Sequence, residues 1–189
     1  MKTLQHYLVL IAITCFSINA FCQCAEPRNY LLSWWTGENH FDDIIGTNNG
    51  SELNGVGFTP GIVSRAFLFD GVDDLILVSD SDNLDLTGDM TLMAWVRRIG
   101  YENQHQTFIC KGAGYVPNNQ PTVFLMRFEF DVTEFLFEDS NGNNIIINGP
   151  AFEDLMYHHY VYVREGNVHR LYGDVFLFNY QTFSSNPAS

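Results

Sequence analysis

The sequence has few basic residues, few cysteines and, after its first residues, no long apolar run. Its 189 residues include only 9 Lys and Arg against 22 Asp and Glu, which gives a net charge of −13. Such a surface repels nucleic acid and anionic lipid, and it suits neutral glycans, cationic partners and bound calcium. The sequence contains no G-x-S-x-G elbow, no phosphate-binding glycine loop and no zinc-type cysteine spacing. We therefore expect no nucleic-acid partner.

One apolar run stands near the N-terminus, over residues 8–21. It has the length of a signal-peptide core and is too short to span a bilayer as a helix. The small residues Ala20 and Cys22 predict cleavage after Cys22, although a cut two residues earlier or three later also fits. Residues 1–22 are then a signal peptide, and residues 23–189 form one domain. This predicts a secreted, cell-surface or periplasmic protein with no membrane insertion after signal cleavage.

Two cysteines remain after this cleavage, Cys24 and Cys110. Export permits a disulfide between them, which would tie the N-terminus to a central strand. The alternative is a free, buried Cys110 and a mobile Cys24.

Short runs of aromatic and β-branched residues recur along the chain, separated by turn pairs such as Asn-Gly, and no window has helical spacing over three turns. Phe124, Met126 and Phe128 alternate with the charged Arg127 and Glu129, as in a half-buried antiparallel strand. The pattern predicts an all-β sandwich or barrel. Strands are predicted at 31–35, 66–69, 75–78, 91–97, 107–111, 123–130, 135–138, 144–147, 157–164, 169–172 and 175–178.

Five pieces of the chain, in order and spacing, resemble LamG-like (laminin G-like) modules, which have a concanavalin A-like jelly-roll fold. The pieces are LLSWWTGEN at 31–39 with DIIGTNNG at 43–50, FLFDGVDD at 67–74 with the strand at 75–78, TLMAWV at 91–96, YHHYVYV at 157–163 and RLY at 170–172. The resemblance implies an antiparallel β-sandwich that binds a carbohydrate or an extracellular protein and is not an enzyme. We expect Trp95 to fill the centre of the sandwich.

The chain departs from such modules at its end, because it stops at Ser189 without their glycine-containing strand and closing strand. The closing strand normally lies beside the opening one, so an edge with Trp34 and Trp35 would be unpaired. We expect either a truncated module or a module whose sheet a second chain completes. A further alternative is a structural or adhesive fragment of a larger surface protein.

Calcium is the cofactor that the resemblance implies. Related modules place an acidic pair at the turn where Asp73 and Asp74 stand, and Asp139 and Asn141 in a later loop are the expected additional ligands. Calcium prefers oxygen ligands from carboxylates and loop carbonyls. The alternative is an Asx-rich turn whose carboxylates bind backbone N–H groups.

The segment with Glu129, Asp131 and Glu134 resembles the E-x-D-x-x-E strand of retaining glucanases with the same jelly roll. In those enzymes, two carboxylates lie on one face and act as nucleophile and acid/base. The module alignment instead places the two glutamates on different strands of a hairpin. Glycoside hydrolysis is therefore the alternative function. His158 and His159 are adjacent in a predicted strand, so they point to opposite faces and do not form a metal pair.

Overall fold

The computed structural model describes residues 30–100, 105–112, 122–139 and 141–183. The chain divides into two compact units, Met1–Leu31 and Leu32–Ser189, and the fold given below is that of the second. The predicted signal peptide and Cys24 lie outside the described residues. Cys110 is an exposed free thiol, so the expectation of a buried Cys110 is wrong. None of the helical segments in the described ranges is long and apolar enough to cross a bilayer.

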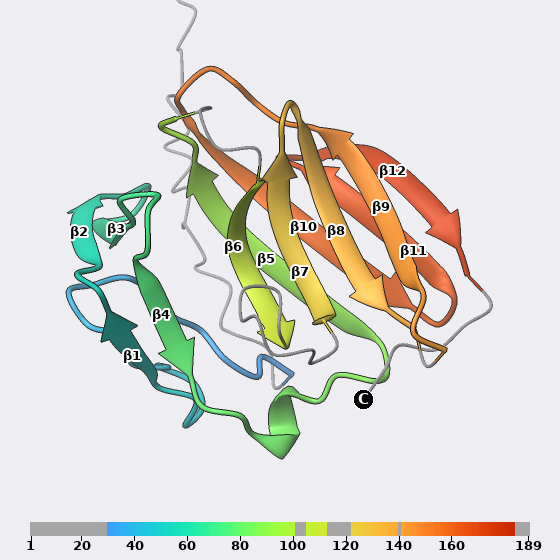
Figure 1. The fold of residues 1–189 in the computed structure, drawn as a ribbon, viewed down its shortest axis with the longest axis horizontal. Coiled ribbons are helices and arrows are strands. Elements are labelled where there is room, and N and C mark those ends of the chain that lie inside the picture. The colour runs from blue at the N-terminus through green and yellow to red at the C-terminus, as the bar shows by residue number, and fades with distance from the viewer. Residues whose placement is uncertain (1–29, 101–104, 113–121, 140, 184–189) are drawn as a thin grey trace, which may run out of the picture. The chain divides into compact units, whose positions relative to one another are not determined.

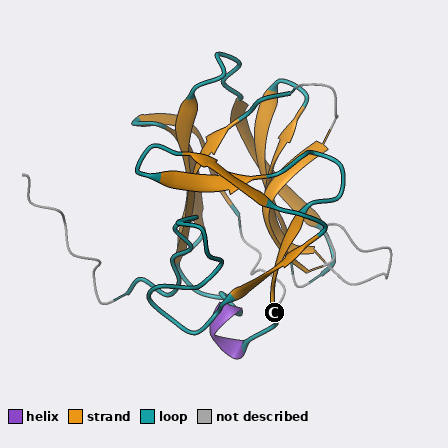
Figure 2. Ribbon diagram, turned by 90° about the vertical axis from the view of Figure 1, so that its left-hand side faces the viewer, coloured by secondary structure: helices purple, strands orange, loops and turns teal. Residues whose placement is uncertain are grey.

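The described part of the second unit is built from twelve strands and one 3₁₀ turn, η1 (Asp82–Leu84), which is its only helical segment (Figure 2). The fold is therefore all-β, as predicted. The strands are β1 (Gly50–Leu53), β2 (Gly57–Pro60), β3 (Arg65–Leu68), β4 (Leu75–Val78), β5 (Met90–Arg97), β6 (His105–Gly112), β7 (Thr122–Glu129), β8 (Val132–Glu138), β9 (Asn144–Pro150), β10 (Tyr157–Glu165), β11 (Val168–Gly173) and β12 (Phe176–Thr182).

Two four-stranded antiparallel sheets form a sandwich (Figure 1). The front sheet has the order β6-β7-β8-β9, and the back sheet has the order β12-β11-β10-β5. Two short antiparallel ladders, β1-β4 and β2-β3, lie to one side of the sandwich in Figure 1. This arrangement confirms the predicted antiparallel β-sandwich.

The core lies between the two sheets and is largely aromatic. The predicted alternation is confirmed on β7, where Phe124, Met126 and Phe128 are buried. They face β10, whose Tyr160 and Tyr162 are at most 1% exposed. Full burial of an apolar side chain such as Phe or Met contributes about 1.5–3 kcal/mol to the stability of the fold. The whole set of buried core residues is Met90, Phe124, Met126, Phe128, Phe135, Phe137, Ile147, Tyr160, Tyr162 and Leu171.

Two buried polar groups in this core have partners. The Tyr162 hydroxyl lies 2.6 Å from Nδ1 of His169, and burial, with a further contribution from the charge of Arg164, lowers the pKa of His169 to about 4. Arg164 donates from Nη2 to the carbonyl of Leu86 at 2.6 Å and also binds the carbonyl of Gly88. Arg164 therefore attaches the loop between η1 and β5 to the core.

A β-bulge in β12 turns an aromatic side chain into the core. Leu171 pairs with Asn179 and Tyr172 pairs with Leu177, which leaves Phe178 as the extra residue. The Phe178 ring lies where side chains at Gly173 and Gly149 would be, so both positions require glycine. The bulge also explains why Leu177 and Tyr180 share the opposite, exposed face.

Three local predictions are wrong, and two short strands were not predicted. Residues 31–35 form no strand, because Trp35 makes only an isolated bridge to Asp43. Trp34 and Trp35 therefore do not form the unpaired strand edge that was predicted. The short strands β1 and β2 were not predicted. Phe130 leaves the apolar face of β7, because it lies in the β7–β8 turn with φ 53° and is 55% exposed. Trp95 is not in the core either, as described below.

Candidate functional site

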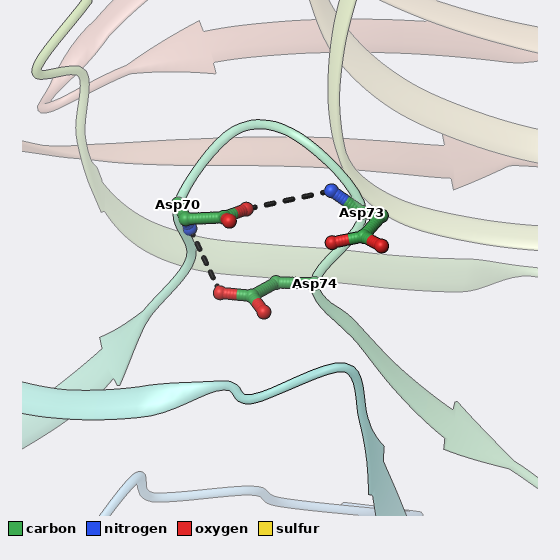
Figure 3. A group of neighbouring side chains, drawn as sticks. All are labelled: Asp70, Asp73 and Asp74. Atoms are coloured by element: carbon green, nitrogen blue, oxygen red, sulfur yellow. Dashed lines mark hydrogen bonds between the residues drawn. The ribbon is translucent and has the colours of Figure 1, made fainter.

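Three carboxylates converge in the loop between β3 and β4 (Figure 3). Asp70, Asp73 and Asp74 each offer an oxygen within 4.8 Å of the others. The loop is held locally, because Asp70 Oδ1 accepts the N–H of Val72 at 2.8 Å and Asp74 Oδ2 accepts the N–H of Asp70 at 2.9 Å. The sequence predicted Asp73 and Asp74 as an acidic pair, and it did not predict the contribution of Asp70.

This group fits calcium in the chemistry of its donors, since calcium prefers carboxylate oxygens. Asp139 is not part of the group: it lies in the β8–β9 loop, and its Oδ1 accepts the N–H groups of Asn141 at 2.9 Å and Asn143 at 2.8 Å. The hydrogen bond from the Asn143 N–H is the main reason that the pKa of Asp139 is lowered. The structure therefore gives Asp139 and Asn141 the Asx-turn role, and it does not bring them into the group of Asp73 and Asp74.

Glu129 and Glu134 lie on different strands, as the module alignment predicted. Glu129 ends β7, and Glu134 lies on β8 directly opposite Arg127. The Arg127 guanidinium binds both carboxylates, with its Nη2 2.8 Å from Glu134 Oε1. Asp131 is in the turn and exposed. Arg127 thus occupies the space between the two carboxylates that a glycosidic bond would need.

The outer face of the back sheet, directed away from the core, carries an exposed tryptophan. Trp95 lies on β5, the edge strand of this sheet, and is 52% exposed. Trp95 lies directly opposite His159 of β10, and the two rings stack with centroids 4.8 Å apart and planes 18° apart. Met93, two residues before Trp95 on β5, is 53% exposed. This edge of the face is therefore apolar and open to solvent.

The neighbours of this ring pair fix its position. Arg97 follows on the same face with its guanidinium 5.1 Å from the ring centre of Tyr157, whose hydroxyl donates to the carbonyl of Pro60 at 2.9 Å. The backbone N–H of His159 donates to Asp174 Oδ1 at 2.9 Å. Burial lowers the pKa of His159, and Asp174 partly offsets this, which favours the neutral imidazole.

A polar hollow of about 230 Å³ lies at the other end of the β1–β4 ladder from the acidic loop. Its lining includes Asn48, whose side chain donates to Ser33 Oγ at 2.7 Å and whose carbonyl accepts the indole N–H of Trp35. Asp80 at its rim is 3.4 Å from Lys111 Nζ. These polar groups are used within the protein, so the hollow is a weaker candidate than the outer face.

No protein-family model matches the sequence, and no curated protein matches it either. The structure is similar to the binding domain of Paraclostridial Mosquitocidal Protein 1, with a TM-score of 0.65 and 13% identity over 83% of this chain and 42% of that chain. It is also similar to the binding domain of botulinum neurotoxin serotype G, with a TM-score of 0.59 and 13% identity over 77% of this chain and 38% of that chain. A carbohydrate-binding module, CBM66 from Bacillus subtilis, gives a TM-score of 0.42 at 19% identity, over 73% of this chain and 84% of that chain.

These comparisons concern the fold. This chain spans less than half the length of each of the first two similar structures. At this level of identity they support the β-sandwich, and they do not identify it as a LamG-like module.

The Trp95–His159 pair was missed by sequence reasoning. The sequence gives one indication of it. Large apolar residues stand at both odd and even positions of β5, so the sequence does not show which face of the strand points into the core.

Proposed function

We propose that this protein is an exported, non-catalytic module that binds a glycan on the outer face of its back sheet. The observation that carries the proposal is Trp95, which is half exposed on the edge strand of that face and stacked on His159. The similarity to two domains whose names describe them as binding domains supports a binding role. The resemblance to LamG-like modules supports an extracellular glycan or protein as the ligand.

The chemistry of the face favours a sugar. A pyranose ring has one face of C–H groups and a rim of hydroxyls, so it pairs with an aromatic ring that has polar neighbours. Trp95 supplies the ring, and His159 and Arg97 supply polar atoms beside it. Exposed apolar side chains gathered on one face mark an interaction surface. The net charge of −13 disfavours polyanions such as nucleic acid.

As part of the same proposal, Asp70, Asp73 and Asp74 bind a calcium ion that fixes the β3–β4 loop. Calcium takes six to eight oxygen ligands, so water and backbone oxygens complete its shell there. The ion would supply structure and would take no part in a reaction. The loop is tied to the neighbouring β1–β2 turn by a hydrogen bond of 2.7 Å from Asn54 Nδ2 to the carbonyl of Asp73.

The deciding experiment compares wild type, Trp95→Ala and Trp34→Ala on an array of glycans, followed by calorimetric titration of each hit. Trp34 is the matched control, because it is 46% exposed and lies outside the sheets. We expect wild type and Trp34→Ala to bind equally, and Trp95→Ala to bind at least about tenfold more weakly, since a tenfold loss corresponds to about 1.4 kcal/mol. A wild type that binds no glycan, or equal binding by all three proteins, would refute the proposal. Binding of an extracellular protein that sugars do not displace would do so as well.

A further inference from the structure

The outer face of the back sheet carries more aromatic side chains than the Trp95–His159 pair. Tyr172 of β11 lies opposite Val161 of β10, and both point away from the core. Tyr180 of β12 lies opposite Arg170 of β11, on the same face. The β12 bulge at Phe178 is what brings Tyr180 to this side.

The register places these rings on one diagonal line across the sheet. Trp95 pairs with His159, and Tyr172 and Tyr180 lie successively further along the strands and across them. With strands about 4.8 Å apart and about 3.3 Å per residue, Tyr172 lies about 12 Å from Trp95, and Tyr180 lies about 8 Å beyond Tyr172. The row of Trp95, Tyr172 and Tyr180 is therefore about 20 Å long, which is longer than a disaccharide.

The row is open to solvent at both ends. Trp95 is 52% exposed and Tyr180 is 64% exposed, while Tyr172 between them is half-buried. The shorter Val161 lies opposite Tyr172 on β10, and Leu177, which lies opposite Tyr172 on β12, is 49% exposed. A ligand that contacts both end rings must lie flat across all four strands.

We infer that the ligand of this face is an extended, unbranched polysaccharide, which lies along the aromatic row with successive sugar rings against Trp95, Tyr172 and Tyr180. This inference rests on the proposed glycan binding and specifies the form of the glycan. A single terminal sugar would need only one ring and a surrounding pocket, whereas an extended chain uses aromatic rings spaced along a flat face.

The charges on this face agree with such a ligand. The basic residues are Arg97 beside Trp95 and Arg170 beside Tyr180, and the latter is paired with Glu165 at 3.1 Å. No carboxylate lies between Trp95 and Tyr180 in the paired register of the four described strands. The row itself carries no Lys, Arg, Asp or Glu between its end rings in this register, which suits an uncharged polymer. A second copy of this chain is disfavoured as the occupant, because it would bring another net charge of −13.

The experiment measures affinity against chain length. Linear oligosaccharides of cellulose, mannan and xylan, from disaccharide to hexasaccharide, are titrated into wild type, Trp95→Ala, Tyr180→Ala and the control Tyr30→Ala, whose side chain is 94% exposed and belongs to no strand. For at least one series, we expect wild-type affinity to rise with length, by roughly 5- to 20-fold between disaccharide and hexasaccharide. Tyr180→Ala should lose this rise while its disaccharide affinity is unchanged, and Trp95→Ala should weaken every length.

Three results separate the inference from the proposed function. Affinity that does not grow beyond the disaccharide, or a Tyr180→Ala protein that matches wild type on the hexasaccharide, overturns the row and leaves glycan binding intact. Failure to bind any of the three polymers also overturns the row, while binding of a short glycan that depends on Trp95 would keep the proposed function. Failure to bind any glycan at all overturns both. Circular dichroism of each variant establishes that the fold is retained.

Discussion

His158 and Asp174 join the start of β10 to the turn between β11 and β12. Nδ1 of His158 lies 2.9 Å from Asp174 Oδ2, and Nε2 of the same ring lies 2.8 Å from Asp154 Oδ1. One imidazole is therefore bracketed by two carboxylates, and its face stacks on Phe152 with ring centroids 3.8 Å apart. Asp174 also accepts the N–H of His159, the stacking partner of Trp95. This ion pair thus lies directly behind the proposed binding face.

The first prediction concerns pH. Burial lowers the pKa of His158, but the hydrogen bonds and charges of Asp154 and Asp174 outweigh this and raise it above its usual value. A raised pKa in the folded state means that the contribution to stability is complete below the unfolded value of about 6.5 and is lost as the pH rises through the folded value. His158→Gln should therefore lower the free energy of unfolding more at about pH 5.5 than at about pH 9.

Urea unfolding across this pH range gives the free energy of unfolding of wild type and of His158→Gln. The difference between the two proteins at each pH isolates His158, because the contributions of the other titrating groups cancel. His169 requires this precaution, because its lowered pKa makes wild-type stability fall as the pH drops below the ordinary histidine value. His40→Gln, in the loop before β1, is the control. A His158→Gln deficit that does not change with pH would show that the ion pairs do not contribute as described.

The second prediction concerns Gly173 on β11. A Cβ at this position would collide with the ring of Phe178, and so would one at Gly149 of β9. Gly173 has no positive φ, so the cost of Gly173→Ala comes from packing and not from the backbone. We expect Gly173→Ala to destabilise the fold by about 1–3 kcal/mol, the usual cost of overpacking a core.

Two further variants test that reason. Gly88→Ala is the matched control, since a Cβ there would have no neighbour within 4 Å, and it should change stability by no more than about 0.5 kcal/mol. In a Phe178→Leu background, Gly173→Ala should cost less than in wild type, because residues in contact are not additive. Equal costs in the two backgrounds, measured by urea unfolding, would contradict the role of Phe178.

Much of the sandwich could be predicted because its strands alternate. In the second half of β7, apolar and charged residues alternate from Met126 to Glu129, and the structure buries Phe124, Met126 and Phe128 as expected. The strand β1 carries the sequence GSEL, which has no such alternation, and it is ordered by pairing with β4. Local pattern could not show that pairing, because it depends on a distant segment.

The same reasoning explains the misplaced Trp95. On β5, Leu92 and Val96 point into the core while Met93 and Trp95 point out, so both faces are apolar and alternation does not distinguish them. The orientation follows from the pairing of β5 with β10, which sets Ala94 opposite the buried Tyr160. The candidate site consists of side chains from four strands in one register, and a single sequence does not give that register.

The third prediction tests the hydrolase alternative. Arg127 is bound between Glu129 and Glu134, so we expect wild type and Glu129→Gln to release no more reducing sugar from β-glucans than a buffer blank. Glu134 is 6% exposed, and Glu134→Gln should destabilise the fold by about 1–3 kcal/mol, whereas the exposed Asp131→Asn should be nearly neutral. Hydrolysis by wild type that Glu129→Gln abolishes would instead establish the catalytic reading.

The fourth prediction concerns calcium at Asp70, Asp73 and Asp74. An ion that binds only the folded state stabilises the protein, by about 2.7 kcal/mol when the ion concentration is a hundred times the dissociation constant. We expect calcium to raise the melting temperature of wild type and to have no effect on the double variant Asp73→Asn/Asp74→Asn. Asp139→Asn is the matched control: its carboxylate is used within its own loop, so this variant should melt earlier and still respond to calcium. A calcium response that persists in the double variant and vanishes in Asp139→Asn would move the site to the β8–β9 loop, and no response in wild type would remove calcium from the proposal.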